Sequence, residues 1–427
     1  MSAVKKTSPW SWVPTLYLAE GLPYALAISV SVVLYKNLGV SNTAIAFWTG
    51  WITLPWVIKP FWGPFVDLLG TRRRWIWAMQ LGLGTAFAGV ALTIPTAHFF
   101  QLTLALFWLA AFSSATHDMA ADGFYILAKS EREQAAFSGV RNTFYRVAMI
   151  GAQGQLVVLA GKIHERTGSF ATAWTVVFAL VAGIFLLFAL YHRWRLPQPS
   201  NDEAGGAGAR NQFAENFSGT FAAFFRKPKI GTLVAFILLY RLGEAQLLPV
   251  AKFFLLDPRA KGGLALSDDQ YGWLYGHLGI GALLAGGLLG GWVVSRRGLK
   301  FWLWPMLLAI HLPDAVFIWL AAAQPQNLQA IGIGVAVEQF GYGFGFTAFM
   351  LYLIRIARGP QATAHYALCT GFMALGMMVP GMWSGWLQAH LGYPLFFGWV
   401  ILATIPSFLI AMKIPLEPEF GRKTSDA

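Results

Sequence analysis

Two carboxylates, Asp118 and Asp122, lie four residues apart in the stretch SATHDMAADGFYIL, inside an apolar run that begins near Phe99. Other acids occur in similarly apolar surroundings, namely Glu20, Glu244, Asp314 and Glu338. An ionised carboxylate that faces lipid at the centre of a membrane span costs about 2.5–3.5 kcal/mol on an insertion scale. We therefore expect these side chains to face a polar interior, where a carboxyl group can contact a polar solute or carry a proton.

Basic residues occur at a similar depth along the chain, namely Lys59, Arg141, Arg146, Arg241 and Lys252. The near balance of buried acids and bases predicts charge pairs that line a water-filled cavity. The candidates for contact with a substrate or with protons are Glu20, Tyr24, Asp118, Arg141, Tyr145, Arg146, Arg241, Glu244 and Glu338.

Glu20 is the strongest candidate, because Gly21 and Pro23 weaken the helix next to it, where a cavity would be useful. It either accepts a proton or contacts a polar substrate, or it forms a salt bridge that only fixes helix packing. Glu244 has the same alternatives. Arg241, three residues before it, would lie on the same helical face and could simply neutralise it.

Asp118 also has two open roles, because contact with substrate or protons competes with a structural bridge to Arg141 or Arg146. Arg146 in turn either holds a carboxylate or phosphate group of a substrate or acts as a permanent counter-ion.

Asp122 lies one turn from Asp118, near the cytoplasmic end of its predicted span. There it could pair with the cluster at residues 72–74 and hold the cytoplasmic side shut. Asp67, at the end of the second span, could oppose the positive end of a helix dipole. The predicted gate residues are Lys59, Asp67, Arg72, Arg73, Arg74, Asp122, Arg296 and Arg297.

The composition explains where such charges must be placed, since 56% of the 427 residues are hydrophobic and only 12% are charged. Apolar stretches of about 20 residues recur along the chain, and each can cross a hydrocarbon core of ~30 Å as a helix. We predict an all-α polytopic membrane protein with spans at about 12–36, 41–66, 75–95, 98–128, 136–163, 168–192, 229–256, 268–294, 299–322, 326–357, 360–388 and 391–413. The first span contains Glu20 and lacks a cleavage site, so we expect it to be retained.

The net charge of +12 follows the positive-inside rule better than it indicates nucleic-acid binding. Lys and Arg concentrate in the predicted cytoplasmic segments, whereas the predicted external links 96–98, 323–326 and 389–391 contain neither. We expect the chain in the inner membrane with both termini in the cytoplasm. The single cysteine, Cys369, excludes an internal disulfide and a cysteine metal cage, and we expect no cofactor and no metal site.

A polar interval at 194–228 divides the predicted spans six and six. It contains RLPQPSNDEAGGAGAR, whose Pro, Gly and charged residues indicate a flexible cytoplasmic linker. Its second part either forms an amphipathic helix on the membrane surface or stays disordered; the helix would have one face built from Phe213, Phe217, Phe221, Phe224 and Phe225. We predict an N-terminal bundle over 1–193, a C-terminal bundle over 229–413 and a cytoplasmic tail over 414–427.

A repeat supports two parallel halves. LYLAEGLPYAL in the first span resembles LLYRLGEAQLLPVAKFF in the seventh, which aligns Glu20 with Glu244. GPFVDLLGTRRRWIW after the second span resembles GGWVVSRRGLKFWLW after the eighth, which aligns Asp67 with Ser295 at nearly the same offset. Internal repeats of this kind are typical of transporters built from two bundles.

Residues 63–74, G-x-x-x-D-x-x-G-x-R-R-R, resemble the loop between helices 2 and 3 of the major facilitator superfamily. VIKPFWGPFVD, THDMAADGFYIL and FYRVAMIGAQG resemble its AmpG-like branch, which contains muropeptide permeases, acetyl-CoA transporters and some siderophore importers. The resemblance implies a major-facilitator fold of two pseudo-symmetric six-helix bundles with alternating access. It also implies proton-coupled import of a peptidoglycan fragment such as an anhydro-muropeptide. A siderophore or an acyl-CoA-like solute is the alternative substrate, and a membrane sensor without transport is the alternative function.

An enzyme is the remaining alternative, because His117 and Asp122 have the H-x-x-x-x-D spacing of glycerolipid acyltransferases. Five residues along a helix separate two side chains by about 140°, which does not place both on one face. A phosphate-binding G-x-x-x-x-G-K-[ST] loop is also missing, so ATP-driven transport is not expected. We predict a monomeric transporter rather than an enzyme, with a small solute, protons and lipid as partners and no nucleic acid.

Overall fold

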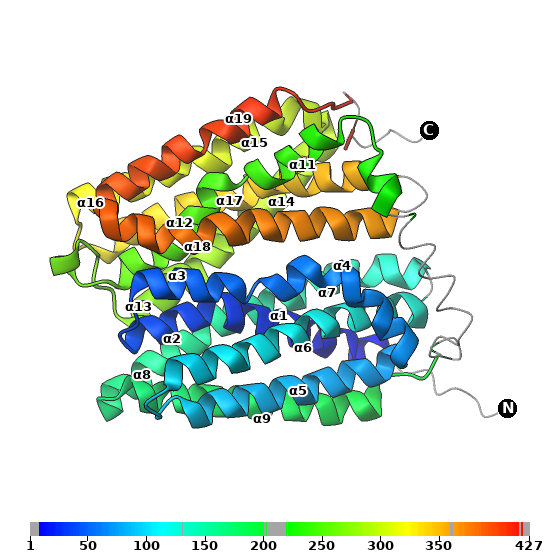
Figure 1. The fold of residues 1–427 in the computed structure, drawn as a ribbon, viewed down its shortest axis with the longest axis horizontal. Helices are drawn as coiled ribbons and strands as arrows, with labels where there is room; N and C mark the ends of the chain where they lie inside the picture. The colour runs from blue at the N-terminus through cyan, green and yellow to red at the C-terminus, as the bar shows by residue number, and fades with distance from the viewer. Residues whose placement is uncertain are drawn as a thin grey trace. The chain divides into compact units, whose positions relative to one another are not determined.

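The computed structural model describes residues 8–129, 131–199, 202, 219, 221–358, 362–417 and 420–421. Within these ranges the side chains at 60, 63–65, 67–69, 131–136, 138–139, 142 and 362–364 are not described. Every regular element in this part of the chain is a helix, and no strand occurs there. Figure 1 shows long helices that run side by side. The all-α prediction is therefore confirmed.

Contacts between residues divide the chain into two compact units. The first unit contains residues 1–38 and 58–218, and the second contains residues 39–57 and 219–427. The predicted second span, 41–66, is thus shared between the two units, because it breaks after Trp51 into two helices. The bundle and linker boundaries expected from the sequence stay predictions, and most of the expected amphipathic segment lies outside the described residues.

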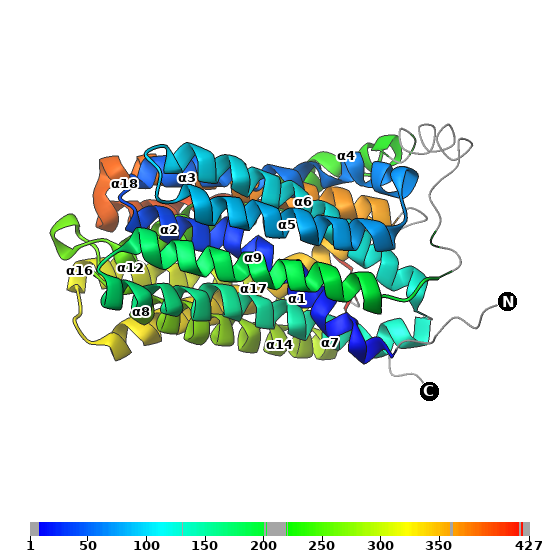
Figure 2. The same cartoon turned by 90° about the horizontal axis from the view of Figure 1, so that it is seen from below.

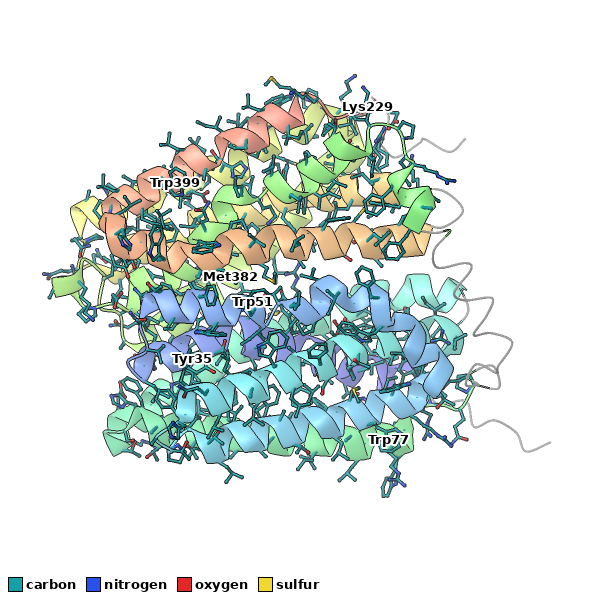
Figure 3. All side chains as sticks on the ribbon, viewed as in Figure 1. Tyr35, Trp51, Trp77, Lys229, Met382 and Trp399 are labelled. Carbon is teal, nitrogen blue, oxygen red and sulfur yellow. The ribbon has the colours of Figure 1, made fainter. Side chains whose placement is uncertain are left out.

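The first unit is a bundle whose longest helices are α5, α6 and α9. Helix α5 packs against both α6 and α9, and α1 packs against α7, as Figures 1 and 2 show from two sides. Its helices are α1 (Val13–Ala25), α2 (Ser31–Asn37), α4 (Leu54–Leu69), α5 (Arg72–Thr93), α6 (Phe99–Ala128), α7 (Glu131–Ile150), α8 (Val157–Thr167) and α9 (Phe170–Arg195), with π-helical segments Leu26–Val30 and Gly151–Leu156. Between α2 and α6, Tyr35, labelled in Figure 3, shares a buried hydrogen bond of 2.9 Å with Thr103.

The second unit has α17 at its centre, packed against α14 and α15, while α18 packs against α12 and α3. In chain order its helices are α3 (Asn42–Trp51), α11 (Ile230–Leu239), α12 (Leu242–Leu256), α13 (Asp268–Tyr271), α14 (Ile280–Arg297), α15 (Leu299–His311), α16 (Ala315–Ala323), α17 (Leu328–Ala357), α18 (Ala362–Ala403) and α19 (Ile405–Ala411). A π-helical segment, Gly272–Gly279, joins α13 to α14. A 3-10 turn, Leu312–Asp314, joins α15 to α16.

Each of the first ten predicted spans coincides with one helix or with a run of consecutive helical segments. Nine helical segments in the described part of the chain are long and apolar enough to cross a membrane. The last two predicted spans run through α18, which kinks at Gly392, where φ is 70°. A positive φ is costly for any residue with a Cβ atom, so glycine allows the chain to turn at the predicted external link.

The glycines of α17 bring three helices into close contact. A Cβ atom on Gly343 would lie 2.0 Å from the carbonyl oxygen of Leu283 on α14. One on Gly341 would lie 2.1 Å from the carbonyl oxygen of Ala309 on α15, and one on Gly345 would lie 2.4 Å from that of Met306. Both faces of α17 therefore pack backbone to backbone, as small residues permit in membrane helices.

A buried polar network joins α3 to the rest of the second unit. The side-chain amide of Asn42 donates to Asp257 at 3.0 Å and to Gln388 at 3.2 Å, and the Tyr393 hydroxyl donates to the same carboxylate. Asp257 is only 3% exposed. Helix α3 also contacts α18 at Gly50, on which Met382 packs; Figure 3 labels Met382 beside Trp51.

The end of the described chain is tied to α15 and α17. The backbone N–H of Leu299 donates to the carbonyl oxygen of Phe420 at 2.7 Å, and the Tyr352 hydroxyl donates to Pro415 at 3.1 Å. The guanidinium of Arg355 makes two hydrogen bonds to the Glu417 carboxylate. These hydrogen bonds lower the pKa of Glu417 from 4.5 to about 2.

We expect Gly343→Ala to lower the melting temperature of the purified protein, because overpacking a tight contact costs about 1–3 kcal/mol. Gly281→Ala on α14 is the matched control, since a Cβ atom there meets nothing within 4 Å. Alanine in place of a helical glycine is otherwise favourable by about 0.5–1 kcal/mol. Equal melting temperatures for the two variants would contradict the packing role of Gly343.

The tail contact is expected to depend on pH. Because the pKa of Glu417 is lowered in the folded chain, the ion pair stabilises the tail above about pH 4.5 and is lost as the pH falls toward about 2. Hydrogen exchange, corrected for intrinsic rates, should show this loss of protection at residues 414–417. In Glu417→Gln the tail should exchange fast throughout, and a wild-type profile in that variant would argue against the contact.

Candidate functional site

Glu20 lies on α1, next to a close contact of this helix with α7. A Cβ atom on Gly21 would lie 2.7 Å from the carbonyl oxygen of Tyr145, so only glycine lets the two helices meet there. The Oε2 atom of Glu20 is buried and accepts no hydrogen bond from the described residues. The tight contact at Gly21 and the candidate acid are thus adjacent in the sequence.

Two ion pairs surround this carboxyl group. Lys59 Nζ on α4 lies 3.7 Å from an oxygen of Asp118 on α6. Arg141 on α7 pairs with Asp122, which also accepts a hydrogen bond of 3.1 Å from the Tyr17 hydroxyl on α1. Four helices therefore place their charged side chains in one cluster, and Glu20 interacts electrostatically with all four of these charges.

These pairs differ from the predicted ones. Asp118 pairs with Lys59 rather than with Arg141 or Arg146, and Asp122 pairs with Arg141 rather than with the arginines at 72–74. The reason lies in the surroundings of Arg141. The guanidinium of Arg141 lies over the rings of Tyr17 and Tyr125, 4.4 and 4.6 Å from their centroids, which holds it beside Asp122.

Three further predicted residues lie near this cluster. Tyr145 interacts electrostatically with Tyr24, Asp118, Glu20 and Arg146, so the structure brings these side chains together. Arg146 is half-buried and makes no hydrogen bond or ion pair with the residues that the structure describes.

A buried polar chain in the same unit was not predicted. Gln80 on α5 donates from Nε2 to His117 Nε2 at 2.9 Å and accepts at Oε1 from His192 Nδ1 at 2.9 Å. An amide NH₂ group only donates, so His117 accepts at Nε2. The amide oxygen of Gln80 only accepts, so Nδ1 of His192 carries the proton, and its Nε2 accepts from the Thr15 hydroxyl. His117 is therefore part of a hydrogen-bonded chain across α1, α9, α5 and α6.

The second unit contains a cluster of acidic side chains, where the first unit has ion pairs. Glu244 on α12, Asp314 in the 3-10 turn and Glu338 on α17 are buried, and one carboxylate oxygen from each lies within 4.8 Å of the others. Arg241 does not pair with Glu244 as its spacing suggested. It lies between α11 and α12 with φ −114° and ψ 24°, so the i, i+3 geometry of a helix is lost. Its guanidinium donates to the Tyr342 hydroxyl instead.

The predicted gate residues have different surroundings. The side chain of Asp67 lies outside the described residues. The Arg73 side chain donates to the carbonyl oxygens of Arg193 and Leu196, and Asp202 accepts from the backbone N–H groups of Arg72 and Arg73. This carboxylate caps the N-terminus of α5, a contact that the sequence did not reveal. The remaining predicted gate arginines, Arg74, Arg296 and Arg297, are exposed.

The fold and the buried charges define a membrane transporter of the major facilitator type. A family model described as the BT1 family matches residues 19–289. The chain therefore belongs to the BT1 family, and its resemblance to AmpG-like proteins is confirmed by its relatives. It is 25% identical over 413 residues to a protein from Rickettsia conorii named putative transporter AmpG 4, covering 93% of this chain and 94% of that protein. It is 24% identical over 415 residues to the anhydromuropeptide permease of Escherichia coli strain K12, covering 95% of this chain and 80% of the permease.

Solved structures support the fold. An inward-facing, unoccupied bacterial homologue of the human lysosomal transporter Spinster superimposes with a TM-score of 0.68 at 16% identity, covering 96% of both chains. The inward-open xylose transporter XylE of E. coli gives a TM-score of 0.65 at 14% identity, covering 95% of this chain and 96% of that one. The family and the similar structures are transporters, so the chain is a multi-pass membrane transporter and not an enzyme. The acyltransferase alternative also fails locally, because His117 contacts Gln80 whereas Asp122 contacts Arg141.

We expect Gln80→Leu to destabilise the protein, because it leaves His117 Nε2 and His192 Nδ1 buried without partners. Each unsatisfied group costs about 1–3 kcal/mol. Gln101→Leu is the control, since this side chain is exposed on α6. Thermal unfolding in one detergent should separate the two variants, and equal stabilities would show that the polar chain contributes nothing.

Proposed function

We propose that this transporter couples the import of an anhydro-muropeptide, or a related amino-sugar peptide, to protons by alternating access. The observation that carries the proposal is the charge of the cluster around Glu20. The pairs of Lys59 with Asp118 and of Arg141 with Asp122 are each neutral. Glu20 is then an additional acid without its own counter-ion among the described residues, which favours uptake of a proton at this position.

The substrate class is suggested by the side chains beside this cluster. A muropeptide carries peptide carboxylates and sugar rings. The guanidinium of Arg146, which has no ion-pair partner among the described residues, can bind a carboxylate with two parallel hydrogen bonds. Tyr24 and Tyr145 can supply ring faces and hydroxyl groups for a sugar. The relative named anhydromuropeptide permease supports the same class at low identity.

We also propose that the protein lies in the inner membrane with both termini in the cytoplasm, and that it transports as a monomer. The arginines at 72–74 and at 296–297 follow corresponding spans of the two halves, as expected for the cytoplasmic ends under the positive-inside rule. The gate role stays assigned to these residues and to Asp67. Asp122 and Lys59 are reassigned to the charge cluster, because their partners lie there.

Proteoliposomes with an imposed pH gradient test the coupling. We expect wild-type protein to accumulate labelled anhydro-muropeptide, and Glu20→Gln to lose at least about tenfold of this accumulation, because a carboxamide cannot exchange a proton at neutral pH. Exchange of labelled for unlabelled solute should persist in the variant. Glu165→Gln, an exposed acid on α8, should behave as wild type.

Other outcomes would overturn parts of the proposal. Unchanged proton-driven accumulation in Glu20→Gln would remove this residue from coupling. Uptake of a ferric siderophore or an acyl-CoA ester, without uptake of the muropeptide, would replace the substrate. Absence of flux for all three solutes would favour a sensor.

A further inference from the structure

The second unit contains a cluster of three carboxyl groups that proton coupling through Glu20 does not use. Glu244, Asp314 and Glu338 come from three separate elements and are 0%, 1% and 2% exposed. One oxygen of each lies within 4.8 Å of the other two. Water therefore has little access to the place where three negative charges can meet.

The cluster is also poor in hydrogen-bond donors. Both carboxylate oxygens of Glu244 and both of Asp314 accept no hydrogen bond from the described residues. Among the described residues, Glu338 accepts only from the side-chain amide of Gln339, at 3.0 and 3.3 Å. Arg241 is near enough to interact electrostatically with Glu244, but its guanidinium donates to Tyr342. Buried carboxyl groups without donors either take up protons or bind another cation, since an unpaired buried charge is strongly destabilising.

The backbone around the cluster points to a ligand independently of the acids. Helices α11 and α12 are interrupted at Tyr240 and Arg241, three residues before Glu244. Helices α15 and α16 are interrupted by the 3-10 turn that ends at Asp314. Interrupted helices inside membranes are tolerated where they line a cavity or an ion site, and transporters bind coupling ions at such breaks.

We propose that Glu244, Asp314 and Glu338 bind a hard, oxygen-ligated metal cation of the size of Na⁺ or Ca²⁺. Such cations take carboxylate oxygens at about 2.3–2.6 Å, so oxygens on opposite sides of one ion lie about 5 Å apart. The separations in this cluster match that spacing. Mg²⁺ fits less well, because it keeps several waters, and the site is almost completely buried.

The charge of the site agrees with this class of ligand. Three carboxylates against the guanidinium of Arg241 leave two negative charges, which one divalent cation neutralises, or one monovalent cation together with a proton. The site lies in the second unit, whereas the proposed proton acceptor lies in the first. The inference therefore does not depend on which solute is carried.

Cation binding can be measured on the purified full-length protein without any solute. In metal-free buffer at constant ionic strength, made up with choline chloride, we expect Na⁺ or Ca²⁺ to raise the melting temperature in a saturable manner. Mg²⁺ should have a smaller effect. Asp314→Asn should lose the cation-dependent shift, and Glu165→Gln should keep it.

A second measurement covers the case in which a variant of a buried acid does not fold. Equilibrium dialysis of wild-type protein with ²²Na⁺ or ⁴⁵Ca²⁺ should show one saturable site per chain, and folded Glu338→Gln should bind at least about tenfold more weakly, because it replaces an ionised ligand by a neutral amide. Absence of saturable binding to wild type would overturn the proposal. The proposal would also be overturned if a lower pH, but no cation, raised the melting temperature, because the cluster would then bind protons. Failure of either kind leaves the transport test of Glu20→Gln unaffected.

Discussion

A charge inside an apolar bilayer needs a partner, and this constraint organises both units of the transporter. In the first unit Lys59 and Arg141 provide that partner for Asp118 and Asp122. These four residues come from three helices, since Lys59 lies on α4, Asp118 and Asp122 lie on α6, and Arg141 lies on α7. The ion pairs therefore also link α4 to α6 and α6 to α7 beside α1, since removing one member would leave the other without its partner.

The second unit meets the same constraint differently, although the sequence around Glu244 resembles that around Glu20. Glu20 lies in a continuous helix with Pro23 inside it, whereas Glu244 follows a break between α11 and α12. The break turns Arg241 toward Tyr342 and leaves Glu244 with acids as neighbours. The two aligned glutamates thus occur in different electrostatic environments, Glu20 beside two ion pairs and Glu244 beside two further carboxyl groups.

Close backbone packing makes both arrangements possible. Gly21 lets α1 meet α7, and the glycines of α17 let it meet α14 and α15. The contacts of the α17 glycines show a packing role. The polar chain through Gln80 and the network around Asp257 are further links between helices. They satisfy buried polar groups that would otherwise weaken the fold.

The sequence alone determined the class of protein, the helical spans and the positions of the buried charges. These features follow from composition and from stretches of about 20 residues, which are local properties of the chain. The partners of each charge were decided only by the tertiary structure. Asp122 contacts Tyr17 from 105 residues away, and Asp257 contacts Asn42 from 215 residues away. Such pairs depend on which faces of distant helices meet, and a break of one or two residues, as at Arg241, is enough to redirect them.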